Sequence, residues 1–131
     1  MAGNTKPIFP KSARIGEANI STANANRTVT GVTGLTSLVA AGADGTRIDR
    51  IRVKATATTT AGMIRIWEYA GSGNAQLVFE IPVNAVTPSA TLASFEADLD
   101  VAVEHLPAGY SYYVSTEKAE AFNVFAFGGD W

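Results

Sequence analysis

Few side chains in this sequence could carry out chemistry, and the most suggestive of them are neighbours at Glu104 and His105. A histidine beside a carboxylate can transfer a proton in general acid–base catalysis. Neighbours in an extended chain point in different directions, however, so this spacing alone does not form a catalytic pair. His105 is the single histidine and there is no cysteine, which excludes a Cys–His dyad and a multi-histidine metal site. We expect His105 to be a loop histidine near the surface, and we expect no catalytic residues.

A second set of ionisable groups is the acidic run Glu96, Asp98 and Asp100, whose carboxylates share one face of a predicted strand. Three such carboxylates could bind Ca²⁺. An equally regular basic set lies on another predicted strand, at Arg50, Arg52 and Lys54. Because opposite charges pair across neighbouring strands, we predict a paired or solvated charged face, with no metal site and no cofactor.

Two motifs that could indicate enzymes are absent or incomplete. The stretch GSGN at 71–74 lacks the spacing of a nucleotide-binding loop and the helix that should follow, so it predicts a hairpin turn. The G-x-S-x-G motif of α/β-hydrolase nucleophiles does not occur. The chain is therefore not expected to be an enzyme.

Composition narrows the possible classes of function further. Charged residues make up 17% of the 131 residues, the net charge is −2 and the pI is about 5.3, which offers no bulk attraction for nucleic acid or an anionic membrane. No apolar run approaches the ~20 residues of a membrane-spanning helix. This length is typical of one domain with one core.

The elements that must position any site are predicted to be strands. From residue 28 onward, short runs of Thr, Val, Ile and aromatic residues alternate with turn residues. The first run spans 27–42, where Gly31 and Gly34 suit β-bulges, and turns are expected at 42–45, 71–74 and 106–109. The sequence predicts an all-β protein, a jelly-roll-like two-sheet β-sandwich. The predicted core is Ile51, Val53, Ile64, Ile66, Leu77, Phe79, Ile81, Phe95, Leu99, Val114, Phe122 and Val124.

Residues 1–27 differ from the rest, and we predict an extended N-terminal arm there, followed by the β-sandwich domain at 28–131. The first 27 residues hold two prolines and only four sizeable apolar residues, without sustained periodicity. Such a segment cannot compensate its ordering entropy by folding on itself. We expect it to be held by another surface, its own domain or a neighbouring subunit, and we prefer a neighbouring subunit with Ile8, Phe9 and Ile15 as anchors.

The last strand, AFNVFAF, is apolar on both faces. Phe122, Val124 and Ala126 fill the core in this interpretation, so Phe125 and Phe127 need a cover on the other face. Aromatic residues are frequent anchors at interfaces. The predicted contact residues for another subunit are Ile8, Phe9, Ile15, Trp67, Tyr69, Tyr113, Phe125, Phe127 and Trp131.

Three stretches that together span about residues 40–131 resemble small proteins encoded by tailed bacteriophages and prophages. They are AGADGTRIDRIRVKATATTTAGMIRIWEY, EIPVNAVTPSATLASFEADLD and LPAGYSYYVSTEKAEAFNVFAFGGDW. Some virion proteins of this size look like jelly-roll decoration, or cement, proteins. The resemblance transfers no functional residues, because cement proteins share no site motif.

The resemblance implies a phage structural protein that decorates and stabilises the capsid by bridging neighbouring capsid subunits. Its partners would be the major capsid protein and further copies of itself, with a homotrimer preferred to a dimer by analogy with jelly rolls that pack about a threefold axis. It would lie on the outer surface of the phage head after synthesis in the host cytoplasm, and it would bind neither nucleic acid nor membrane.

Two other classes stay open. One is a virion protein of the tail, neck or fibre, which would have a similar sequence. The other is a carbohydrate-binding β-sandwich module, in which Trp67, Tyr69 and Tyr113 would stack on sugar rings. A sugar-binding module should leave these aromatic side chains exposed in a concave site, whereas a cement protein should bury them against protein.

Overall fold

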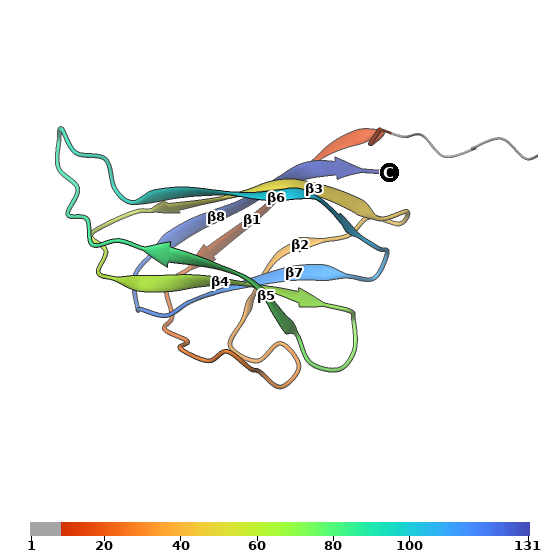
Figure 1. The fold of residues 1–131 in the computed structure, drawn as a ribbon, viewed down its shortest axis with the longest axis horizontal. Coiled ribbons are helices and arrows are strands. Elements are labelled where there is room, and N and C mark those ends of the chain that lie inside the picture. The colour runs from red at the N-terminus through yellow and green to blue at the C-terminus, as the bar shows by residue number, and fades with distance from the viewer. Residues whose placement is uncertain (1–8) are drawn as a thin grey trace, which may run out of the picture.

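The computed structural model describes residues 9–131, with the backbone only at positions 102 and 103. Every regular element in this part of the chain is a strand (Figure 1). The strands are β1 (Ser12–Ile20), β2 (Thr36–Ala40), β3 (Thr46–Ala55), β4 (Gly62–Tyr69), β5 (Gln76–Val83), β6 (Glu96–Leu106), β7 (Ser111–Thr116) and β8 (Phe122–Asp130).

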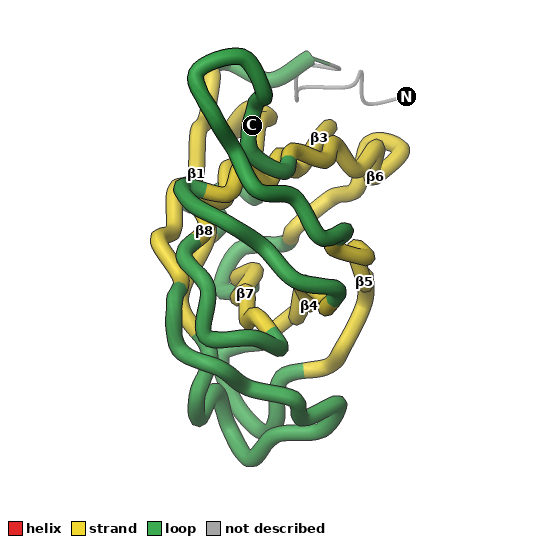
Figure 2. The backbone as a smooth tube through the Cα atoms, turned by 90° about the vertical axis from the view of Figure 1, so that its left-hand side faces the viewer, coloured by secondary structure: helices red, strands yellow, loops and turns green. Residues whose placement is uncertain are grey.

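The strands form two antiparallel sheets that lie one above the other (Figure 1). Sheet A has the strand order β1-β8-β3-β6, and sheet B has the order β2-β7-β4-β5. The pairs β1–β8, β2–β7, β3–β6 and β4–β5 correspond to one long folded ribbon, which wraps so that β8 also pairs with β3 and β7 with β4. This pairing is the jelly-roll arrangement, so the predicted fold class is confirmed. Figure 2, a view from one end, shows connecting loops gathered in front of the strands.

The core lies between the two sheets and follows the predicted alternation closely. Most of the predicted core residues are buried there, together with Ile48, Leu106 and Tyr112. Leu77, Phe79 and Leu99 are only half-buried, which corrects the prediction for these three. Phe79 and Leu99 pack against the core from β5 and β6, free edges of the two sheets, where no further strand shields them. Leu77 does not join the core, because a register shift after Ile66 places it opposite Trp67.

Residues 12–20 of the predicted arm form a strand of the domain itself. Strand β1 pairs with β8 along its whole length, from Ser12 opposite Asp130 to Ile20 opposite Phe122. It also lies against β2, because a Cβ atom added at Gly16 would be 2.5 Å from the Leu38 carbonyl oxygen. The predicted division at residue 27 therefore has to be corrected: residues 12–20 are the edge strand of sheet A.

Residues 21–35, which we call the strap, cover the outer face of sheet B (Figure 1). Asn24 N–H donates to the Thr116 carbonyl of β7, and Gly31 accepts from the Ala75 N–H just before β5. The strand predicted over 27–42 is therefore confined to β2. Gly31 and Gly34 have φ angles of 61° and 76°, values that favour glycine, and they lie in turns of the strap rather than at bulges.

The carboxylate of Asp130 ties three segments together at the end of β8. It accepts hydrogen bonds from Arg14 Nη1 of β1 at 3.1 Å and from the Thr46 hydroxyl of β3 at 2.6 Å. The same Thr46 oxygen accepts from the Gly42 N–H at 2.9 Å, in the turn predicted at 42–45. The end of β8 is therefore ordered, because Asp130 bonds to both neighbouring strands.

Candidate interaction surface

The outer face of sheet A changes from apolar to charged across its four strands. The strand registers place two rows of outward side chains across it: Ile15–Phe127–Arg50–Asp100 and Glu17–Phe125–Arg52–Asp98, each in the order β1, β8, β3, β6. This face carries three of the predicted contact residues, Ile15, Phe125 and Phe127, which we call the apolar strip.

The apolar strip is held in place but not covered by the described chain. The rings of Phe125 and Phe127 are stacked, with centroids 6.1 Å apart and planes inclined by 22°. Both rings are half-buried, and Ile15 beside them is 57% exposed. The Arg50 guanidinium carbon lies 4.9 Å from the Phe127 ring centroid, a cation–π contact that fixes one border of the strip. An ordered, partly exposed apolar surface of this kind is typical of a protein contact.

The charged half of the face confirms the predicted cross-strand pairing of the acidic and basic sets. Arg52 Nε lies 2.9 Å from Asp98 Oδ1 and 3.5 Å from Glu96 Oε1. The hydrogen bond from Arg52 lowers the pKa of the Asp98 carboxyl, because it stabilises the charged form. On sheet B, the hydrogen bond from Arg27 of the strap lowers the pKa of Glu80 in the same way.

These two lowered pKa values predict an acid-labile contribution to stability. A carboxyl with a lowered pKa in the folded state stabilises the fold above its unfolded pKa of about 4, and this contribution is lost as the pH falls through the folded value. We therefore expect a lower urea midpoint at pH 3 than at pH 6. NMR titration should place the pKa of Asp98 below the ordinary value of an aspartate, and Arg52→Gln should raise it. An unchanged Asp98 titration in Arg52→Gln would contradict the assignment.

Phe9 and Trp131 lie at the end of the sandwich where the chain enters β1 and leaves β8. Phe9 is 72% exposed, and the Lys11 N–H two residues later donates to the Asp130 carbonyl oxygen. Trp131 is half-buried, and its Nε1–H donates to His105 Nδ1 at 2.9 Å. The single histidine is thus an exposed acceptor for a tryptophan near the end of β6. Ile8, predicted as an anchor beside Phe9, lies outside the described residues.

The remaining predicted contact residues lie on sheet B, away from the apolar strip. Tyr69 and Tyr113 are half-buried and meet edge to face, with ring centroids 5.8 Å apart. Trp67 is fully buried, and its Nε1–H donates to the Ser115 hydroxyl at 3.0 Å. It is not available to another subunit or to a sugar ring, so its prediction as a contact residue has to be corrected.

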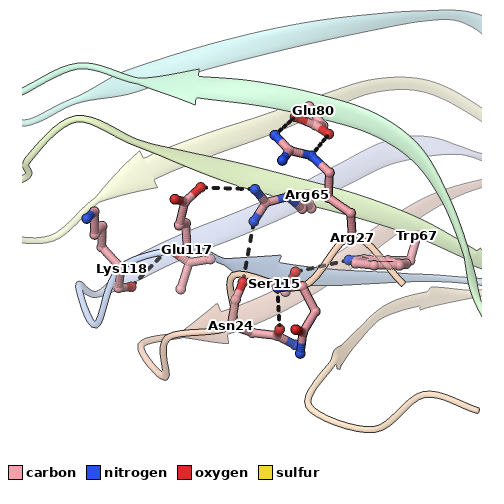
Figure 3. A network of polar contacts seen from close by, with 10 residues as sticks. Asn24, Arg27, Arg65, Trp67, Glu80, Ser115, Glu117 and Lys118 are labelled. Carbon is pink, nitrogen blue, oxygen red and sulfur yellow. Dashed lines mark hydrogen bonds and ion pairs between the residues drawn. The ribbon is translucent and has the colours of Figure 1, made fainter. Parts of the chain in front are cut away.

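Trp67 is buried on the outer face of sheet B together with a buried cation that the sequence interpretation missed (Figure 3). Arg65 is 1% exposed; its Nη2 donates to Glu117 at 3.0 Å and its Nη1 to the Asn24 carbonyl of the strap at 3.4 Å. The signal was present in MIRIWEY, which is apolar on both faces, because strands of that kind are normally covered on both sides. The strap is that cover.

No family model and no curated protein sequence matches the chain. Among the side chains described in residues 9–131, no group of three or more acidic residues, histidines or cysteines could hold a metal ion. The same residues include no helix with the length and hydropathy needed to cross a lipid bilayer.

Proposed function

We propose that this chain is a structural protein of a tailed-phage particle that decorates and stabilises the outside of the head by bridging capsid subunits. The jelly-roll topology recurs in viral capsid and lectin domains, but a fold alone is shared by unrelated functions. The observation that carries the proposal is the placement of exposed and half-buried apolar side chains. Ile15, Phe125 and Phe127 share one outer sheet face, and Phe9 projects at the end of the sandwich.

In this proposal the two locations have separate partners. The end of the sandwich at Phe9, with the residues that precede it, contacts the major capsid protein. The outer face of sheet A serves self-association. Individually modest contacts suffice for a decoration protein, because an oligomer attached at several sites gains from a high effective concentration.

Removal of residues 2–9 is expected to reduce binding to phage heads without unfolding the domain. The deletion must end there because Pro10 packs on Gly129 and the Lys11 N–H bonds to Asp130. A longer deletion through residue 20 would remove β1 and its buried Ala18 and Ile20. Occupancy should be measured by titrating purified protein onto heads that lack it and quantifying the bound protein.

A point variant provides the matched comparison. Phe9→Ser should raise the protein concentration needed to half-saturate the heads by about tenfold or more, the range of an interface hot spot. Val78→Ser removes an exposed apolar side chain from β5, an edge strand of sheet B. This variant should bind heads like the unmodified protein. Full decoration by both the deletion and Phe9→Ser would exclude this end of the molecule as the capsid contact. Failure of the unmodified protein to bind heads would overturn the proposed function.

A further inference from the structure

The order of charges across the outer face of sheet A is complementary to itself. In one row, an acidic residue on β1 and a basic residue on β3 flank the aromatic side chain of β8: Glu17, Phe125 and Arg52. Glu17 is exposed, and its carboxylate has no ion-pair partner among residues 9–131. A partly exposed apolar strip has an unpaired acid on one side and, on the other, a base that also bonds Asp98 of its own copy. Such a surface fits another of the same pattern, turned around.

We infer that a second copy of this chain packs face to face on sheet A, about a twofold axis that runs parallel to the strands and over β8. This inference rests on the self-association in the proposed function and names its surface and symmetry. Rotation about that axis lays β8 on β8 and exchanges its two neighbours, so β1 of each copy faces β3 of the other. Phe125 and Phe127 then cover their equivalents, and each Glu17 faces Arg52 of the second copy.

The charge pattern distinguishes this axis from the other twofold that would stack the two faces. An axis in the plane of the face but perpendicular to the strands lays each strand on its own equivalent. Arg50 and Arg52 of β3 would then face the same arginines, and the acidic residues of β6 would face one another. Like charges placed opposite each other disfavour association, so the axis parallel to the strands is preferred. Both axes keep the strands of the two copies roughly aligned, as in face-to-face sheet packing, so the charges decide between them.

The size of the face predicts a weak dimer. Three strands about 4.8 Å apart and about nine residues long, at about 3.4 Å per residue, cover roughly 450 Å² per copy. A standard stable interface buries about 800 Å² per partner, so a dissociation constant on the order of 10–100 µM is expected. The inference therefore gives a dimer, the alternative to the trimer expected by analogy.

Sedimentation velocity from about 5 to about 500 µM, which brackets that constant, should show a monomer–dimer equilibrium. Glu17→Lys should weaken dimerisation by about tenfold or more, because it sets a cation against Arg52 of the second copy. Asp44→Lys makes the same charge change in the exposed turn before β3 and should leave dimerisation unchanged. A chain that stays monomeric at the highest concentration, or equal weakening by both variants, would overturn the inference.

Cross-linking tests the axis itself. Because the chain has no native cysteine, only the introduced cysteine can react. Asn123 of β8 and Glu96 of β6 flank Lys54 in one row of the face. Asn123→Cys lies next to the proposed axis and should be joined to its equivalent by a short bismaleimide, whereas Glu96→Cys should not. The perpendicular axis would place the two positions of this row equally far from their equivalents, so cross-linking of Glu96→Cys at least as fast as that of Asn123→Cys would overturn the inference.

Head binding separates this inference from the function on which it rests. Heads decorated by a chain that is monomeric in solution and does not cross-link at Asn123→Cys would leave the proposed function standing and remove the dimer. A dimer with the predicted cross-link that binds no phage heads would keep the dimer and remove the proposed function.

Discussion

Gly128→Ala is expected to lower the free energy of unfolding by about 3 kcal/mol or more, at or above the upper end of overpacking effects. Gly128 lies in β8, between β1 and β3, where a Cβ atom would overlap the carbonyl oxygen of Arg47. No rotamer change can relieve a clash with backbone, so β3 and β8 would have to separate near the bulge that follows Ile48. Urea unfolding followed by far-UV circular dichroism measures the loss.

Gly62→Ala is the matched control for this variant. It also adds one methyl group to a strand residue, but the new Cβ atom meets only Cγ of Lys118 at 3.1 Å and the Thr60 carbonyl oxygen at 3.8 Å. The flexible lysine side chain can move, so the change in unfolding free energy should stay within about 1 kcal/mol. Equal stability of the two variants would show that β3 and β8 do not approach as closely as described.

Trp67→Ala is expected to cost about 3–5 kcal/mol, the range for a large buried aromatic side chain. Trp67 is fully buried on the outer face of sheet B and also satisfies the buried hydroxyl of Ser115. The loss should appear as a lower midpoint in urea unfolding. Because the core between the sheets is untouched, a loss of this size means that the strap and the outer face of sheet B belong to the cooperative fold.

Two comparison variants separate the contributions of Trp67. Trp67→Phe keeps most of the ring volume and removes the indole N–H, so it should cost about 1–3 kcal/mol. Tyr113→Ala removes an aromatic side chain that lies opposite Trp67 on β7 but is only half-buried, so it should cost less than Trp67→Ala. If Tyr113→Ala costs more, Trp67 is not covered in the way described.

Local sequence patterns predicted the strands whose inward and outward residues contrast strongly. In β3 the buried residues Ile51 and Val53 alternate with charged residues, and in β8 the inward and outward faces were both assigned correctly. The two-residue period of a strand and the conformations of turn residues are local properties, so they can be read without knowledge of the partner strands.

Residues 12–35 were harder to predict because their partners are distant in sequence. The inward residues of β1 are mostly small, Gly16 and Ala18 followed by Ile20, so the strand has little hydrophobic alternation. Its place is determined by pairing with β8, more than a hundred residues later. The strap has no periodicity at all, and what holds it is contact with sheet B, including the Arg65 side chain.

The interaction surface was only partly predictable for the same reason. The alternating acidic and basic runs correctly indicated cross-strand pairs, because their matching periods suit neighbouring strands. The predicted aromatic contact residues were collected without knowledge of the topology, which separates Phe125 and Phe127 on sheet A from Tyr69 and Tyr113 on sheet B. Which side chains share a face depends on strand order, and strand order is not a local property.

The central claim, decoration of a phage head, is tested most directly by imaging. Under the proposed function a phage or prophage encodes the chain, and its particles should be compared by electron cryomicroscopy with particles from which the gene has been deleted. The account predicts that regularly placed densities the size of a 13.7 kDa domain, or of its dimer, disappear from the outer surface of the head, and that adding the purified protein restores them. Loss of density confined to the tail or neck, or identical particles with and without the gene, would contradict it.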